Sequence, residues 1–176
     1  MQKGQDKKQV GLSLISAILV IVLDQLSKSW VRGNLTIGES LPETGFFRLT
    51  YVANPGAVFG LPVNQTFLLI ITTLVILLII PLFLYYLSAR YRSPITSLCI
   101  ICFGLILGGA IGNLIDRLRF AYVTDFIDIR LWGNFHWPAF NFADASIVIG
   151  TCTLAYALFR SGLFRKVYDH NRNNRN

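Results

Sequence analysis

The chain has 176 residues, of which 53% are hydrophobic and 14% are charged, and its mean hydropathy is +0.54. Soluble domains have about 25% charged residues, so this composition excludes a disordered chain and most soluble enzymes. It also excludes a nucleic-acid-binding protein with a solvated basic face, although the formal net charge is +7.

Four stretches are apolar and long enough to cross a membrane, which takes about 20 mostly apolar residues. They are Val10–Trp30, Thr66–Leu87, Ile95–Ile115 and Phe140–Phe159. The first begins like a secretory signal, but it runs into Asp24, Gln25 and Lys28 instead of a small-residue cleavage site, which indicates an uncleaved anchor. We therefore predict an all-α membrane protein with four transmembrane helices, forming a single integral membrane domain over residues 1–176.

The distribution of Lys and Arg predicts the orientation, because short cytoplasmic loops carry the excess of basic residues. Ten of the 16 lie in the N-terminal segment, the 88–94 loop and the C-terminal tail, and six lie on the side of the loops 31–65 and 116–139. That second side also holds seven of the nine acids and all three tryptophans. We predict that both termini are cytoplasmic, that the two long loops are extracytoplasmic, and that the basic charge reflects topology and no nucleic-acid partner.

The two long loops contain patterns typical of β-strands. In residues 46–52, Phe47, Leu49 and Tyr51 alternate with Arg48 and Thr50, as in a half-buried strand. Residues 122–129, with the sequence YVTDFIDI, are a second candidate strand. We expect a small extracytoplasmic β-sheet on the outer membrane face.

Ionisable residues within membrane spans are costly and are candidates for a functional site. Asp24 and Lys28 are four residues apart, so they can pair on one face of the first helix. Two interpretations stay open: a structural ion pair that holds this helix in the bundle, or a direct part in catalysis.

The third span combines a glycine repeat with polar residues at its outer end. Glycine recurs at every fourth position, at Gly104, Gly108 and Gly112. Such a face permits close helix packing, which is sufficient to explain the glycines. The same face continues to Asn113, Asp116 and Arg117, so close packing would bring a polar ridge to the centre of the bundle. An ordinary polar helix end is the alternative.

The fourth span opens with Asn141 and Asp144, the spacing of a helix N-cap and an acid at the third helical position. Capping is the simplest interpretation. However, an apolar span follows Asp144 at once, which places it at or below the membrane interface. Asp125 lies in the candidate strand 122–129, which leads back to the same surface.

Two carboxylates that meet in a pocket of low dielectric constant cannot both ionise, so the pair shares a proton. The ionised member can deprotonate a water molecule, and the protonated member can donate to a carbonyl oxygen. The outer side offers no nucleophile–His pair, so the sequence favours peptide hydrolysis by two aspartates. From the residues alone, Asp116 or Asp128 could replace Asp125 or Asp144 in the pair.

Cysteine and histidine give no indication of a metal site. Cys99 and Cys102 form a single CxxC without a second pair, and His136 and His170 are too few and too far apart. We expect no metal and no cofactor.

Five strings of the sequence resemble the bacterial lipoprotein signal peptidases (signal peptidase II), in the same order and with plausible separations. They are LDQLSK (23–28), NPGAVFG (54–60), GGAIGNLIDR (108–117), VTDFID (123–128) and FNFADASI (140–147). The resemblance covers nearly the whole membrane-embedded chain. In the VTDF string, Thr124 stands where an aliphatic residue is common in the family.

The resemblance implies an aspartic endopeptidase that removes the signal peptide from diacylglyceryl-modified prolipoproteins, cutting N-terminal to the lipidated cysteine. The catalytic residues would be Asp125 and Asp144. Seven further polar residues would bind substrate or shape the site: Asp24, Lys28, Asn54, Asn113, Asp116, Arg117 and Asn141. The expected location is the bacterial inner membrane, with the active site near the outer leaflet. Prolipoproteins and membrane lipid are the expected partners, and we expect a monomer.

Two rival functions fit parts of the pattern. A small ion-coupled transporter would also place carboxylates in a membrane, but transporter sites usually lie near the bilayer midplane between internal repeats. Here the acids gather toward one face, and no repeat is visible. A non-catalytic membrane subunit would use Asp24–Lys28 and Asp116–Arg117 as structural pairs, with Arg117 neutralising Asp116, and it leaves Asp125 and Asp144 without a role.

Overall fold

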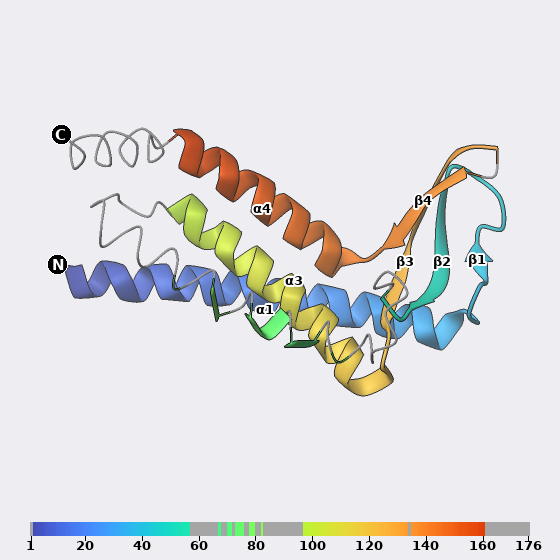
Figure 1. Ribbon diagram of the computed structural model, residues 1–176, viewed down its shortest axis with the longest axis horizontal. Helices are drawn as coiled ribbons and strands as arrows, with labels where there is room; N and C mark the ends of the chain where they lie inside the picture. Colours follow the sequence, from blue (N-terminus) through green and yellow to red (C-terminus); the bar gives the residue numbers. More distant parts are fainter. Residues whose placement is uncertain are drawn as a thin grey trace, which may run out of the picture.

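The computed structural model describes residues 2–56, 97–133 and 135–160, together with scattered positions between 67 and 82. Three long helices lie along one another, and a β-sheet covers one end of them (Figure 1). The helices are α1 (Gln2–Asn34), α3 (Ser97–Phe120) and α4 (Phe142–Arg160). The start of α1 and the end of α4 both point away from the sheet (Figure 1).

Each of these helices contains a segment that is apolar and long enough to cross a membrane: Val10–Asn34, Leu98–Phe120 and Phe142–Arg160. Three of the four predicted spans are therefore confirmed. The second predicted span, 66–87, lies for the most part outside the described residues.

Helix α3 packs against both α1 and α4, and its glycines make the close approach possible. A Cβ atom added at Gly104 or Gly108 would lie 2.5 or 2.7 Å from a carbonyl oxygen of α1, and one at Gly112 would lie 2.6 Å from the Asp24 carboxylate. The predicted tight packing along this face is confirmed. Gly109, which the sequence analysis did not single out, allows the same approach to the α4 backbone at Ala143.

The ends of α1 and α3 lie beyond the predicted boundaries, at Asn34 and Phe120 instead of Trp30 and Ile115. Asp116, which the predicted boundaries placed in the extracytoplasmic loop 116–139, therefore lies in the last turns of α3. The helices continue past the point where hydropathy falls, because polar side chains in these turns find partners on neighbouring elements.

The sheet has four antiparallel strands in the order β1-β2-β3-β4. They are β1 (Ser40–Leu41), β2 (Phe47–Asn54), β3 (Val123–Trp132) and β4 (Phe135–Phe140). The two predicted strands correspond to β2 and β3, so the small sheet is confirmed. The edge strands were not predicted, since β1 has only two residues and β4 contains Pro138, a residue that argues against a strand from sequence alone.

The pairing of β2 with β3 contains a bulge. Leu49 pairs with Ile127 and Val52 pairs with Asp125, so two residues of β2 lie opposite one residue of β3. Beyond the bulge, Asn54 pairs with Val123.

A small apolar core fixes the sheet to the end of α1. Val31 and Leu35 of α1 pack with Tyr51 of β2 and Phe126 of β3, and all four side chains are buried. This core holds β3, the strand that carries Asp125, against α1.

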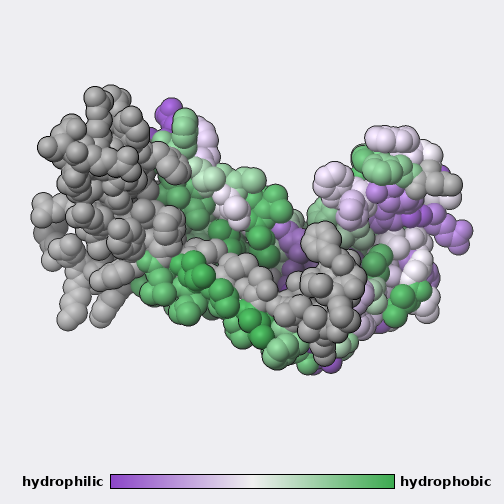
Figure 2. Space-filling view, viewed as in Figure 1, coloured by the Kyte–Doolittle hydropathy of each residue, from purple (hydrophilic) through white to green (hydrophobic). Residues whose placement is uncertain are grey.

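The surface separates into two zones, apolar over the helices and mostly polar or mixed over the sheet (Figure 2). Large apolar side chains of α1 and α4 are exposed; Leu26, for example, is 65% exposed and Val148 is 60% exposed. Apolar surface on this scale fits contact with lipid hydrocarbon rather than with water.

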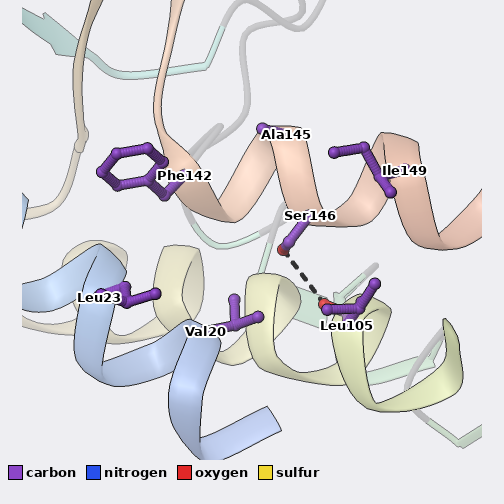
Figure 3. A pocket seen from close by; sticks show the side chains of 7 residues that line it. All are labelled: Val20, Leu23, Leu105, Phe142, Ala145, Ser146 and Ile149. Atoms are coloured by element: carbon purple, nitrogen blue, oxygen red, sulfur yellow. Dashed lines mark hydrogen bonds between the residues drawn. The ribbon is translucent and has the colours of Figure 1, made fainter. Parts of the chain in front are cut away.

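An apolar pocket of about 200 Å³ opens between α1 and α4, with α3 as its floor (Figure 3). Its lining residues are Val20, Leu23, Leu105, Phe142, Ala145, Ser146 and Ile149. The hydroxyl of Ser146, its single polar side chain, donates to the carbonyl oxygens of Leu105 and Ala143 at 3.1 and 2.7 Å. None of the candidate site residues lines this pocket, so it is separate from the site described next.

Candidate active site

Asp125 is the third residue of β3 and is 2% exposed. Its carboxylate accepts one hydrogen bond from the Asn54 side-chain amide at 2.8 Å and one from the Asn141 side-chain amide at 2.7 Å. The first donor belongs to the neighbouring strand β2, and the second directly precedes α4. The β2–β3 register and the start of α4 therefore fix the orientation of this carboxylate.

Asp144 lies in the first turn of α4, where it completes a reciprocal cap with Asn141. The backbone N–H of Asp144 donates to the Asn141 side-chain oxygen at 2.9 Å, and the backbone N–H of Asn141 donates to the Asp144 carboxylate at 3.2 Å. The predicted capping arrangement is thus present. The other carboxylate oxygen accepts from the Asn113 side-chain amide at 2.7 Å.

Asn141 donates to both carboxylates, to Asp125 from its side-chain amide and to Asp144 from its backbone N–H. Two aspartates that are distant in sequence therefore converge on one residue. Burial raises the pKa of Asp125, and so does the nearby Asp144, whereas the hydrogen bonds from Asn54 and Asn141 lower it; the net result is a pKa of about 6.

A cluster of buried charges lies between α1 and α3, behind the two aspartates. The Lys28 ammonium contacts the carboxylates of Asp24 at 2.8 Å and Asp116 at 3.4 Å, and none of these three side chains is exposed. Lys28 also donates to the Asn113 side-chain oxygen at 2.8 Å. Because Asn113 is the donor to Asp144, the cluster holds the amide that orients this aspartate.

The cluster also connects α1 to the start of α4. The second carboxylate oxygen of Asp24 accepts a hydrogen bond from the backbone N–H of Ala143 at 3.0 Å. The pairing of Asp24 with Lys28 was predicted from their spacing, whereas this contact across 119 residues was not.

Arg117 lies at the outer end of α3 and is half-buried. Its guanidinium is within electrostatic range of Asp144, Asp125 and Asp116, in that order of strength. Within the described part of the chain it forms no ion pair. The sequence analysis left open whether this arginine neutralises Asp116, and the ion pairs of Asp116 are made by Lys28 and Arg32 instead.

The comparison with protein families identifies the family to which this chain belongs. Residues 16–160 match the family model described as signal peptidase (SPase) II, which is most of the chain and includes every candidate site residue. The chain belongs to the signal peptidase II family. It is therefore a peptidase, and with its apolar spanning helices it is a membrane-embedded one.

Curated relatives agree with this assignment. The chain is 48% identical over 147 residues to a lipoprotein signal peptidase of Moorella thermoacetica, covering 82% of this chain and 91% of the relative. It is 43% identical over 169 residues to a lipoprotein signal peptidase of Desulforapulum autotrophicum, covering 91% of this chain and 96% of the relative.

The fold is similar to solved structures of bacterial membrane enzymes determined by the in meso method. One, at 2.3 Å resolution, has a TM-score of 0.67 with 30% identity and covers 85% of this chain and 88% of that chain. Another, at 1.9 Å, has a TM-score of 0.68 with 30% identity and covers 84% and 92%. The helices and sheet of this signal peptidase II therefore have the arrangement of known membrane enzymes.

The sequence analysis assigned no site role to three residues of the site region, which are Gln25, Arg32 and Thr124. The Gln25 side-chain amide donates to the Gly112 carbonyl oxygen at 3.0 Å, which ties α1 to α3. Arg32 donates to the Thr124 hydroxyl at 2.8 Å, and the Thr124 backbone N–H donates to Asp116 at 2.9 Å. Each of these contacts joins two different elements, so the spacing of residues in the sequence does not predict it. The sequence offered one indication, Thr124 at a position that is commonly aliphatic in the family; its hydroxyl accepts the hydrogen bond from Arg32.

Proposed function

We propose that this signal peptidase II removes the signal peptide from diacylglyceryl-modified prolipoproteins, cutting N-terminal to the lipidated cysteine, with Asp125 and Asp144 as its catalytic pair. The names of its relatives support the substrate class. The contacts of the carboxylates support the choice of the two aspartates.

One observation supports this choice above the others. Of the extracytoplasmic-side acids, Asp24, Asp116 and Asp128 each form an ion pair with a basic side chain. Within the described residues, Asp125 and Asp144 form none and accept hydrogen bonds from amide N–H groups only. Asp116 and Asp128 are therefore poor alternatives, because a carboxylate held by a cation is kept from exchanging protons.

The two members have different roles. Asp125 is the buried one, and its raised pKa suits the member that holds the shared proton. Asp144 lies in the first turn of α4, at the positive end of the helix dipole, which stabilises a carboxylate. Asp144 is thus the general base and Asp125 is the general acid.

In the reaction, Asp144 takes a proton from a water molecule as the water oxygen attacks the scissile carbonyl carbon. Asp125 gives its proton to the carbonyl oxygen, which produces a neutral tetrahedral diol. Asp144 then passes its proton to the amide nitrogen of the cysteine, the C–N bond breaks, and a hydroxyl proton of the diol returns to Asp125. Both aspartates end in their starting protonation states.

The other site residues orient this pair or bind substrate. Asn54, Asn141 and Asn113 hold the carboxylates, and the ion pairs of Lys28 with Asp24 and Asp116 hold Asn113 in turn. The guanidinium of Arg117 can donate a hydrogen bond to a carbonyl oxygen of the substrate peptide or of its lipid ester.

The position of the site fits a substrate that arrives sideways from the bilayer. The pair lies where β3 and the start of α4 meet, at the sheet end of the helices, and polar surface lines the hollow between helices and sheet in Figure 2. Together with the charge distribution, this supports an inner-membrane enzyme with both termini cytoplasmic and its site near the outer leaflet. Prolipoproteins and lipid are its partners, and a monomer holds the complete pair.

The test measures cleavage of a lipidated prolipoprotein by purified Asp125→Asn and Asp144→Asn proteins, with folding checked by thermal unfolding. Each is expected to lose about 10²- to 10⁴-fold in kcat, the usual contribution of general acid–base catalysis. Glu43→Gln, at an exposed position of the β1–β2 loop, is the matched control and should keep its activity. A folded Asp125→Asn or Asp144→Asn protein with near-normal turnover would exclude that residue from the pair. Dissipation of an ion gradient in vesicles without cleavage would indicate a transporter.

A further inference from the structure

A second polar cluster lies within the sheet, apart from the catalytic pair. Asp128 of β3 accepts hydrogen bonds from Arg48 Nε at 3.0 Å and from the Thr50 hydroxyl at 2.8 Å, both on β2. Its other carboxylate oxygen contacts His136 Nδ1 of β4 at 2.8 Å. We call these four residues the Asp128 cluster; it joins the three long strands, and Asp128 is its centre.

Nothing in the proposed reaction uses this cluster, yet Asp128 is only three residues from Asp125 on the same strand. Asp128 is 5% exposed. The pKa of Asp128 is lowered, since the hydrogen bonds from His136, Thr50 and Arg48 together outweigh its burial. Asp128 is therefore a fixed anion and not a second proton carrier.

Thr50 is the member of the cluster that lies in the β2 bulge. Between the Leu49–Ile127 and Val52–Asp125 pairs, Thr50 and Tyr51 lie opposite the single residue Phe126. A strand alternates its side chains between two faces, so an extra residue decides which face every later side chain occupies. The bulge therefore determines that Asn54, further along β2, presents its amide to Asp125.

Side chains hold both residues of the bulge. Tyr51 packs in the apolar core below the sheet, and its hydroxyl is 2.7 Å from that of Tyr122. Thr50 is held by Asp128, and the Ser40 hydroxyl of β1 lies 2.8 Å from the Thr50 oxygen. Two contacts hold the bulge: the packing of Tyr51 in the core and the hydrogen bond from Thr50 to the charged Asp128. Loss of the Thr50–Asp128 hydrogen bond removes the second of them.

We propose that Thr50 and Asp128 are positioning residues for catalysis: their hydrogen bond fixes the β2 bulge and thereby holds Asn54 against Asp125. The proposal rests on the proposed function, because it assigns the effect to Asp125 as the proton-holding member. It gives the sheet a part in the chemistry beyond supporting the site.

The expected signature is a shift in the pH profile. The Asn54 amide donates to Asp125 and stabilises its charged form, so a displaced Asn54 lets the pKa of Asp125 rise above about 6. Three charged groups face Asp125 from the helices: Asp144 of α4, Lys28 of α1 and Arg117 of α3. A Thr50 substitution leaves all of these charges unchanged, which makes Thr50 a cleaner probe than Asp128.

The experiment compares Thr50→Val with Thr50→Ser in the full-length enzyme, using a lipidated prolipopeptide and measuring kcat and KM against pH. Val keeps the branched shape without the hydroxyl, and Ser restores the hydroxyl. Thr50→Val is expected to lose about tenfold in kcat, the order of one hydrogen bond to a charged group. In the plot of kcat against pH, the descending limb at high pH should shift to higher pH, as in Asn54→Ala, while KM changes little. Thr50→Ser should recover both properties, and Ser40→Ala, which leaves the bond to Asp128 intact, should not move the limb.

The double variant Thr50→Val/Asn54→Ala distinguishes positioning from general loosening. If Thr50 acts through Asn54, the double variant should resemble Asn54→Ala alone. Fully additive losses, or a Thr50→Val protein that is slower but has an unshifted limb, would overturn the positioning role. If Thr50→Val does not fold, Thr50→Ala removes the same hydroxyl with a smaller side chain, leaves every charge unchanged and provides the same test. Active Asp125→Asn protein would instead overturn the catalytic pair itself, whatever the Thr50 variants do.

Discussion

The carboxylates of this membrane enzyme fall into two regions that differ in their partners. In the cluster between α1 and α3, Asp24 and Asp116 are fully buried and contact the Lys28 ammonium. In the catalytic region, Asp125 and Asp144 contact the amides of asparagines. Asp125 is nearly as buried as Asp24 and Asp116, whereas Asp144 is partly exposed, so burial alone does not separate the two regions.

The difference shows how a membrane protein assigns structural and chemical roles to one residue type. A cation fixes the charge of a buried carboxylate and makes it a structural tie. An amide satisfies the hydrogen bonds of a carboxylate without neutralising it, so two such groups in proximity must share a proton. Asn113 joins the regions, since it accepts from Lys28 and donates to Asp144.

The largest effect is expected from the structural region. Lys28→Met leaves Asp24 and Asp116 without the cation they share, and breaking a buried pair typically costs about 3–5 kcal/mol. The thermal unfolding temperature in detergent should fall steeply. A second change, Lys28→Met/Asp24→Asn, should recover part of the loss because it removes one of the stranded charges.

Arg119→Met is the matched control for this comparison. Arg119 is an exposed cation on α3 that lies over the Phe120 ring at 5.6 Å, and an exposed contact of this kind contributes about 0.5–1 kcal/mol. If Lys28→Met unfolds at the same temperature as Arg119→Met, the α1–α3 cluster is not a structural tie.

A smaller effect on stability and a clear effect on activity are expected at Asn141, which contacts both catalytic carboxylates. Asn141→Ala removes the cap of α4, at about 1 kcal/mol, and the donor to Asp125, so kcat should fall about 10- to 100-fold. Asn141→Ser keeps an oxygen for the cap but is too short to donate to Asp125. Ser should therefore restore the unfolding temperature and leave kcat low. Recovery of kcat by Ser would show that Asn141 only caps the helix.

Hydropathy and local spacing predicted much of the fold, because they depend on neighbours in sequence. The three described spans, strands β2 and β3, and the Asp24–Lys28 pair all follow from such patterns. The short edge strands did not, since β1 and β4 exist only through their pairing with β2 and β3.

The candidate site was less accessible to sequence reasoning, because its decisive contacts join distant segments. From the residues alone, Asp116 and Asp128 were possible members of the catalytic pair. The neutralisation of Asp128 by Arg48 depends on the β2–β3 register, and a bulge in that register has no signature in the alternation of side chains. Arg32, the second cation of Asp116, was missed because its partner lies 84 residues away.

The smallest of these effects is a change in the pH dependence of kcat/KM. It tests most directly whether Asp125, which has amide partners instead of a cation, exchanges a proton during catalysis. The active form has Asp125 protonated, so kcat/KM should fall as the pH rises through the pKa of Asp125, about 6. Asn54→Ala removes a donor that favours the charged form, so the pKa rises and the descending limb should move up by about one pH unit. Glu43→Gln, at an exposed position of the β1–β2 loop, leaves the contact between Asn54 and Asp125 in place and should not move this limb. If Asp125 were instead the ionised member, its pKa would set the ascending limb at low pH; an ascending limb that moves upward in Asn54→Ala, with the descending limb unmoved, would exchange the roles of the two aspartates.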